Sequence, residues 1–283
     1  MPQAKSLTCI VNNYNRCHFI PKCLESILAQ KVDFPVDIVV VDDFSTDRSK
    51  ETVAEIKRAH PDASIHFLST TANTGLGKRA IIELDAALKP FMQARYYYRI
   101  DSDDYITDPT KFAKQVAALE AHPECVAACH RYNILEDATG REHVEKGLPA
   151  GIYSTSDLID LWGSVVLYSH ASTYLYRNIH QAVMPPLFRD QSWAVGDVIY
   201  NWIMLRDGKI FVSEDVMSTY RVHSGGVWNS LTEQEKNRAN SALNYKVFRA
   251  FTPANKLRFA TRKLRRRSLR IWNRISTSGT KVS

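Results

Sequence analysis

The chain has 283 residues, of which 45% are apolar, and this is enough for one large domain or for one domain with an appendage. No run of about 18 apolar residues occurs, so the sequence predicts no membrane-spanning helix. The apolar run near the N-terminus is too short to predict a secretory signal. The five cysteines lack the spacing of a disulfide framework, which favours reduced thiols and a cytoplasmic setting.

The net charge of +7 is unevenly distributed along the chain. No Asp or Glu follows Glu235, and residues 236–283 contain 14 of the 37 Lys and Arg residues. Residues 1–235 therefore carry 23 basic and 30 acidic residues, so the body is acidic and only the tail is basic. This balance argues against a nucleic-acid-binding body, because contacts to phosphates need a basic surface.

Strands alternate with helices over the first hundred residues. Residues 36–41 (VDIVVV) form a near-continuous apolar run, which is typical of a parallel strand buried on both faces. Residues 76–88 place their apolar side chains on one face of a helix. This rhythm favours an α/β sheet with right-handed crossovers. The other predicted strands are residues 6–11, 64–69 and 96–100, and the other predicted helices are residues 18–30 and a segment that ends before Pro61.

The second half is less regular. Residues 132–152 predict a hairpin or a loop, and no linker is visible before about residue 235, so we expect the two halves to share one fold. Helices are predicted at residues 155–163 and 196–208, and strands at residues 172–176, 209–213 and 216–223.

Polar clusters follow three of the predicted strands: NNYNR at residues 12–16, DDFSTD at 42–47 and DSDD at 101–104. Ligands of open α/β sheets bind beyond the carboxyl ends of the strands, so we expect these clusters to form one site. No Gly-x-Gly-x-x-Gly follows the first strand, which counts against a dinucleotide-binding fold.

The acidic cluster predicts a divalent metal. At the end of an extended strand, residues two apart point the same way, so Asp101 and Asp103 should converge while Asp104 turns aside. Carboxylate oxygens select Mg²⁺ or Mn²⁺. The alternative is a solvated acidic turn, with Asp108 capping the next helix.

Cys125, Cys129 and His130 offer a second candidate metal site, for zinc. They lie in an apolar, strand-like run, HPECVAACH, which favours buried structural cysteines instead.

Five segments, in this order, resemble the family 2 glycosyltransferases over most of residues 6–230. The resemblance implies a GT-A fold: a Rossmann-like nucleotide-binding sheet with helices on both faces in a donor half (about 1–130), merged with a smaller acceptor half (about 131–235). The segments are CIVNNYNRCHFIPKCLESILAQ, VVVDDFSTDRS, NTGLGKR, RIDSDDYI and GDVIYNWIMLRDGKIFVSEDVMSTYRVHSGGVW.

The resemblance also implies roles in binding a nucleotide-diphosphate sugar, with UDP favoured. Tyr14 would stack on the base, Asp43 would accept a hydrogen bond from a base N–H, and Asn12 would lie near the base. Tyr14 is otherwise an ordinary surface residue, and Asp43 a helix cap. Further donor-binding candidates are Asn73, Lys78, Arg79, Asp101 and Ser102, with Lys78 and Arg79 as candidates for the diphosphate.

The same resemblance assigns the metal and the catalytic base. Asp103 would bind Mn²⁺ or Mg²⁺ directly, His223 would complete the site, and Asp101 would reach the ion through water. Asp197 would be the general base of an inverting, single-displacement transfer. The competing interpretations are a satisfied core histidine at His223 and a plain helix N-cap at Asp197.

Acceptor contacts are expected in the second half, from His170, Trp193 and Trp162, which are otherwise core residues. The acceptor would be a glycan or a lipid-linked glycan of a bacterial surface polysaccharide. Two other functions stay open: a sugar-phosphate nucleotidyltransferase, although NNYNRCH lacks the expected glycines, and a nucleic-acid-binding protein that uses the basic tail.

The tail, residues 236–283, contains a predicted amphipathic helix over residues 252–275. Thr252 and Pro253 suit its start, and nine Lys and Arg residues lie between Lys256 and Arg274. We expect this helix to hold the protein on an anionic membrane surface, at the cytoplasmic face. The alternative is packing on the body or on a second copy, as a homodimer. Its apolar stripe is Leu257, Ala260, Leu264, Ser268, Ile271 and Ile275, with Trp272 beside it.

Overall fold

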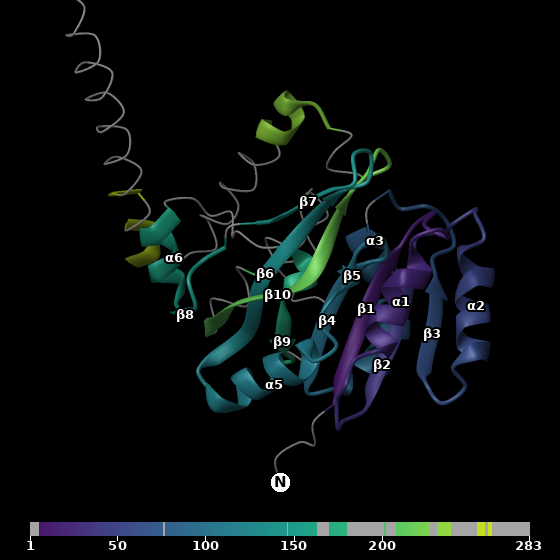
Figure 1. Ribbon diagram of the computed structural model, residues 1–283, viewed down its shortest axis with the longest axis horizontal. Coiled ribbons are helices and arrows are strands. Elements are labelled where there is room, and N and C mark those ends of the chain that lie inside the picture. The colour runs from purple at the N-terminus through teal and green to yellow at the C-terminus, as the bar shows by residue number, and fades with distance from the viewer. Residues whose placement is uncertain are drawn as a thin grey trace, which may run out of the picture.

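The computed structural model describes residues 6–75, 77–145, 147–162, 170–179, 201, 208–226, 231–238, 254–257, 260 and 261. These residues form one curled sheet with helices on its two faces (Figure 1). The sequence prediction of an α/β fold is confirmed.

The first half contributes four parallel strands in the order β3-β2-β1-β4. β1, β2 and β4 are mostly buried, as expected for parallel strands covered on both faces, whereas the edge strand β3 buries only Ile65. Because the strands are parallel, the carboxyl ends of β1, β2 and β4 meet at one edge. The bounds are β1 (Leu7–Asn13), β2 (Val36–Asp42), β3 (Ser64–Ser69) and β4 (Tyr96–Asp101).

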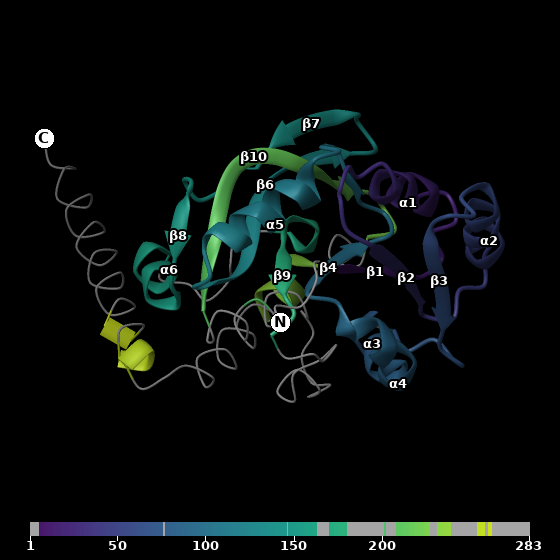
Figure 2. The same cartoon turned by 90° about the horizontal axis from the view of Figure 1, so that it is seen from below.

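Two apolar clusters cover the two faces of this sheet (Figure 2). One face packs against α1 (Ile20–Leu28), α2 (Ser49–Ala59) and α5 (Lys111–Ala121). The other face packs against α3 (Gly77–Glu83), α4 (Asp85–Leu88) and α6 (Thr155–Trp162). A short 3₁₀ helix, η1 (Lys89–Gln93), leads from α4 into β4.

The second half extends the same sheet. The long strands β6 (Cys125–Glu136) and β10 (Lys209–Val222) pair in parallel, and the short strand β9 (Leu175–Arg177) joins β6 to β4 by antiparallel pairing on both sides. β4, β6 and β10 therefore run in the same direction. The end of β10 lies at the edge where β4 ends, and β10 pairs there with β5 (Tyr105–Ile106). The remaining elements are β7 (Arg141–Val144), β8 (Gly151–Tyr153) and η2 (Ala171–Thr173).

Most predicted elements of the first half lie within two residues of the observed ones, and residues 64–69 match β3 at both ends. Three predictions were wrong. The strand predicted at residues 172–176 is part of a 3₁₀ helix at 171–173 followed by β9. The single helix at 76–88 is two helices, because Leu84 leaves helical geometry (φ −89°, ψ 9°). The two strands at 209–213 and 216–223 are the single strand β10, which passes through the polar residues between them with irregular register. The predicted helix at 196–208 lies almost wholly outside the described residues.

Candidate functional site

The polar clusters after β1, β2 and β4 come together as the sequence predicted. Asn12 lies opposite Asp101 in the β1–β4 register, and its side-chain amide donates a hydrogen bond of 2.9 Å to the Asp101 carboxylate. Asn13 lies opposite Asp42 in the β1–β2 register and donates to the Asp42 carboxylate at 2.7 Å. The central strand β1 thus links the two acidic strand ends through two amides.

The Asp43 end of the site is built from hydrogen bonds to neutral donors. Asp43 is 3% exposed, and its Oδ1 accepts from the Thr74 backbone N–H at 2.8 Å and from the Thr70 hydroxyl at 3.4 Å. Asn73 donates its amide to the Asp43 carbonyl at 3.3 Å. Tyr14, expected to stack on a base, lies at the end of the neighbouring strand and is 43% exposed.

The basic residues expected at a diphosphate lie after this loop. Arg79 donates to the Thr74 carbonyl at 3.3 Å, so it lies against the loop that supports Asp43. The side chain of Lys78 lies outside the described residues.

Ser102 is buried, and its hydroxyl donates to the side-chain carbonyl of Asn13 at 2.7 Å. Its backbone N–H donates to the Asn12 carbonyl at 2.9 Å. Ser102 therefore supports the two asparagines of β1, and contact with a donor would require that support to change.

Asp103 and His223 lie in contact although 120 residues separate them. The His223 Nε2 is 2.9 Å from the Asp103 Oδ2, and the His223 ring packs on Phe19 at 4.7 Å. The Arg16 Nε donates to the same carboxylate oxygen at 3.2 Å, and its Nη2 donates to the Gly225 carbonyl at 2.6 Å. One carboxylate oxygen thus accepts from a guanidinium and faces an imidazole, and both groups stabilise its negative charge.

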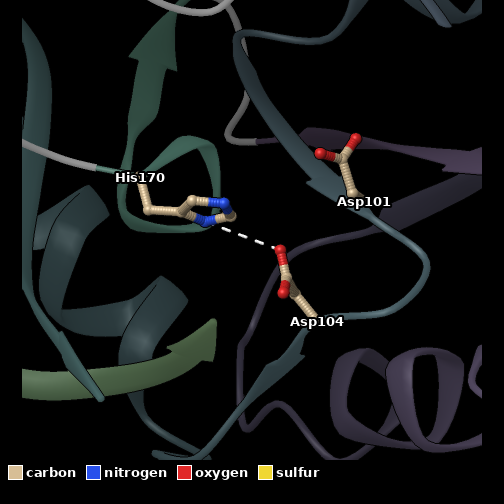
Figure 3. A group of neighbouring side chains, drawn as sticks. All are labelled: Asp101, Asp104 and His170. Atoms are coloured by element: carbon tan, nitrogen blue, oxygen red, sulfur yellow. Dashed lines mark ion pairs between the residues drawn. The ribbon is translucent and has the colours of Figure 1, made fainter. Parts of the chain in front are cut away.

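The expectation that Asp104 turns aside was wrong. β4 ends at Asp101, and the Asp104 N–H donates to the Asp101 carbonyl at 3.0 Å, so the chain turns and the alternation of a strand does not continue. Asp104 is 1% exposed, and its Oδ1 accepts from the Arg221 backbone N–H at 3.0 Å. Its Oδ2 lies 3.5 Å from the His170 Nδ1 (Figure 3).

Asp101, Asp104 and His170 form a group whose possible ligand atoms lie within 4.8 Å of one another (Figure 3). Burial, followed by the neighbouring charge of Asp103, raises the pKa of Asp101 and raises the pKa of Asp104 well above its usual range. Oxygen and imidazole ligands at this turn fit a divalent cation such as Mn²⁺ or Mg²⁺.

His170, expected at the acceptor, lies against this acidic turn. Its ring stacks on Tyr220 with centroids 4.3 Å apart and lies 5.7 Å from the Tyr132 ring. Its Nδ1 is also 3.0 Å from the Ser172 hydroxyl. Trp193, Asp197 and the side chain of Trp162 lie outside the described residues.

The cysteines that suggested zinc are buried in β6, as the alternative interpretation predicted. Burial raises the pKa of the Cys125 thiol to about 11 and that of the Cys129 thiol to about 12. Both are therefore neutral thiols near pH 7.

Two site residues escaped the sequence prediction. Arg16 and Asp104 are both held by partners that lie more than 60 residues away in the chain. The only sequence signal was their position inside the polar clusters after β1 and β4.

A family model described as "Glycosyl transferase family 2" matches residues 8–181. An uncharacterized protein of Mycobacterium tuberculosis is 28% identical over 225 residues, which are 77% of this chain and 59% of the relative. The poly(ribitol-phosphate) beta-N-acetylglucosaminyltransferase TarS of Staphylococcus aureus is 30% identical over 173 residues, 59% of this chain and 27% of TarS. The chain thus spans well under two thirds of these relatives.

Solved structures share the fold. The structure of S. aureus TarS 1–349 in complex with UDP-GlcNAc has a TM-score of 0.58 at 20% identity, over 87% of this chain and 65% of that chain. A mannosyltransferase from Pyrobaculum calidifontis in complex with GDP-Man and Mn²⁺ has a TM-score of 0.54 at 17% identity, over 90% of this chain and 72% of that chain.

Proposed function

We propose, because this chain belongs to glycosyl transferase family 2, that it transfers a sugar from a nucleotide-diphosphate donor, with a UDP-sugar favoured, to a glycan or lipid-linked acceptor. The contact between Asp103 and His223 carries the proposal. It brings a carboxylate and an imidazole together at the edge where β1, β2 and β4 end, which is where sheets of this type bind ligands.

The donor would lie along this edge. Asp43 and Tyr14 lie at the end suited to the base, and Asp101, fixed by Asn12, lies at the end suited to the ribose or the metal shell. The loop of Asn73 and Arg79 offers polar and cationic groups beside Asp43.

Asp103 and His223 would hold Mn²⁺ or Mg²⁺, and Asp101 would reach the ion through water. The fit rests on the donor set: three carboxylates crowd this turn beside the imidazoles of His170 and His223. When bound, such an ion offsets the negative charge that develops on a leaving diphosphate. The chain's own part is to orient Asp103, through Arg16 and His223, towards the place where that charge develops.

Asp197 would take the proton of the acceptor hydroxyl as that oxygen attacks the anomeric carbon. A single displacement from the face opposite the leaving group inverts the anomeric centre and needs no covalent enzyme intermediate. His170 and Trp193 are the proposed acceptor contacts. Because His170 lies beside Asp104, it would connect the acceptor half to the acidic turn.

A role in bacterial surface polysaccharide synthesis is supported by the similarity to TarS and by a 35% identity over 99 residues to a teichoic acid poly(glycerol phosphate) polymerase of Staphylococcus epidermidis. That match covers 35% of this chain and 13% of the polymerase. Family membership favours sugar transfer over the nucleotidyltransferase alternative.

The tail would place this activity at the inner face of the cytoplasmic membrane. Among the described residues, no helix has the length and apolar character needed to span a bilayer. In residues 252–275, the described residues 254–257, 260 and 261 are helical, and Leu257 is 71% exposed. The full chain should bind anionic liposomes at low salt, and a chain truncated after Thr252 should not bind them. Failure to bind would make the tail a packing or dimer element.

The activity itself is tested by thermal shift with UDP, GDP, dTDP and CMP compounds, each with and without Mn²⁺. A ligand that binds the folded state raises the melting temperature, by an amount that grows with its concentration. We expect a UDP compound with Mn²⁺ to give the largest shift. No shift with any nucleotide in either condition would contradict the proposed function.

A further inference from the structure

Phe44 adopts a backbone conformation that bulky residues rarely occupy. It follows β2 directly after Asp43, and its φ is +60°, in the left-handed region where a Cβ crowds the backbone. The other described non-glycine residue with positive φ is Asn15, at +51°, whose side-chain oxygen accepts from the Thr46 N–H at 2.8 Å. Asparagine is tolerated in that region because of such local bonds, and phenylalanine has no polar atom to make one.

Phe44 is also 45% exposed, so burial of its ring offsets little of the free energy that the backbone strain costs. Backbone strain that packing does not offset is concentrated at active sites and ligand sites. An observed outlier of this kind therefore motivates a functional hypothesis.

Tyr14 and Phe44 lie on neighbouring segments, just beyond the paired residues Asn13 and Asp42. The Asp43 N–H donates to the Asn13 carbonyl at 2.9 Å, and the Asn15 N–H donates to the Ser45 hydroxyl at 2.8 Å. These two bonds hold the segments together on either side of Tyr14 and Phe44, whose side chains are 43% and 45% exposed. Among the residues that the structure describes, neither ring packs on another aromatic ring.

We infer that Phe44 and Tyr14 together form the aromatic surface on which the nucleobase of the donor stacks, and this rests on the proposed function. The place in the sheet favours a base over an acceptor sugar. β2 and β4 flank β1, so about 10 Å separates Phe44 from the acidic turn, at two strand spacings. That distance leaves room for a ribose between a base at Phe44 and a diphosphate at Asp103.

The inference predicts that stability and binding respond to Phe44 in opposite directions. Phe44→Gly removes the strain, so the nucleotide-free protein should melt at or above the wild-type temperature. The same change removes one stacking surface, so affinity for UDP and UMP should fall about 5- to 100-fold. Affinity for Mn²⁺–pyrophosphate, which has no base, should stay unchanged.

The experiment measures melting temperature and the binding of UDP, UMP and Mn²⁺–pyrophosphate by titration calorimetry, on the full chain. Phe44→Tyr keeps the ring and should bind as wild type. Phe44→Leu keeps the apolar bulk and the strain but lacks the ring, and should lose affinity for UDP and UMP. Val144→Ala is the matched control, since Val144 is a 49% exposed apolar side chain on β7.

Wild-type affinity for UDP and UMP in Phe44→Gly and Phe44→Leu would overturn the inference and leave the proposed function standing. A melting temperature of Phe44→Gly several degrees below wild type would also overturn it, because Phe44 would then be a packing residue. Absence of nucleotide binding in the wild-type protein would instead contradict the proposed function itself.

Discussion

The two acidic ends of the site hold their charge in different ways. At the β2 end, Asp42 and Asp43 are buried and accept from backbone N–H groups, hydroxyls and the Asn13 amide. At the β4 end, Asp103 receives Arg16 and His223, and Asp104 lies against His170.

Neutral donors satisfy the first end within the fold itself. The second end places three carboxylates within four positions, and Asp103 pairs with Arg16 while Asp104 lies against His170. The β2 end is thus satisfied within the fold, whereas at the β4 end burial and the charge of Asp103 raise the pKa of Asp101 and Asp104, and the proposed cation would offset that charge.

The largest expected effect serves as the reference for both ends. Asp197→Asn keeps the shape of the residue but cannot take a proton, so turnover should fall about 10²–10⁴-fold. Binding of UDP and of Mn²⁺ should be unchanged, because Asp197 would belong to neither acidic end. Steady-state kinetics and calorimetry on the same preparation check both statements. Near-normal turnover would reduce Asp197 to a helix cap.

Asp103→Asn tests the β4 end. The amide cannot carry the charge that a divalent ion needs, so the Mn²⁺-dependent part of UDP affinity should fall about 100-fold or more. Calorimetry of UDP with and without Mn²⁺ measures that part. Asp62→Asn, on the exposed surface after α2, is the matched control. An unchanged Mn²⁺ dependence would move the metal to the Asp101, Asp104 and His170 group.

Asp43→Asn tests the β2 end and should lower UDP affinity by the same factor with and without Mn²⁺. Loss of one charge-assisted hydrogen bond to the base costs about 1.5–3 kcal/mol, so UDP affinity should fall about 10- to 150-fold. The ratio of affinities with and without Mn²⁺ should stay at its wild-type value. A changed ratio would mean that the β2 and β4 ends are coupled, which contradicts their description as two independent ends of the site.

Asp104→Asn gives the smallest expected effect, on stability against pH. Burial raises the pKa of Asp104 in the folded state, whereas an unfolded Asp has a pKa of about 3.9. Asp104 therefore stabilises the fold fully below about pH 4 and loses this contribution as pH rises towards the raised pKa.

In chelator, wild-type melting temperature should fall from pH 4 towards neutrality more steeply than that of Asp104→Asn. Thermal unfolding at one-unit pH intervals measures the two slopes, with Asp62→Asn as the control. Equal slopes would show that Asp104 titrates as an ordinary carboxyl.

The parallel part of the sheet could be predicted from sequence because its signals are local. The apolar run of β2 and the full extent of β3 are visible in a window of a few residues. The break at Leu84 was not predictable, because no Pro or Gly marks it. β10 was divided in two because residues 213–215 are polar, yet pairing with β6 carries the strand past them.

The site was predictable as a set of strand ends but not as a set of contacts. The strand alternation that placed Asp101 and Asp103 together stops at Asp101, where hydrogen bonds form a turn. The partners of Arg16 lie at Asp103 and Gly225, and no local pattern connects such distant positions. These contacts follow from the sheet order, which periodicity does not determine.

The contact between Asp103 and His223 has a consequence for how the molecule is made. The strands β1 to β4 have near neighbours in sequence and can pair early, whereas a contact across 120 residues must wait for a large loop to close. On the ribosome, the donor half emerges well before residue 223 leaves the exit tunnel. The nascent chain can therefore complete the β2 end of the site before the β4 end, whose contact between Asp103 and His223 forms only after nearly the whole body has been synthesised.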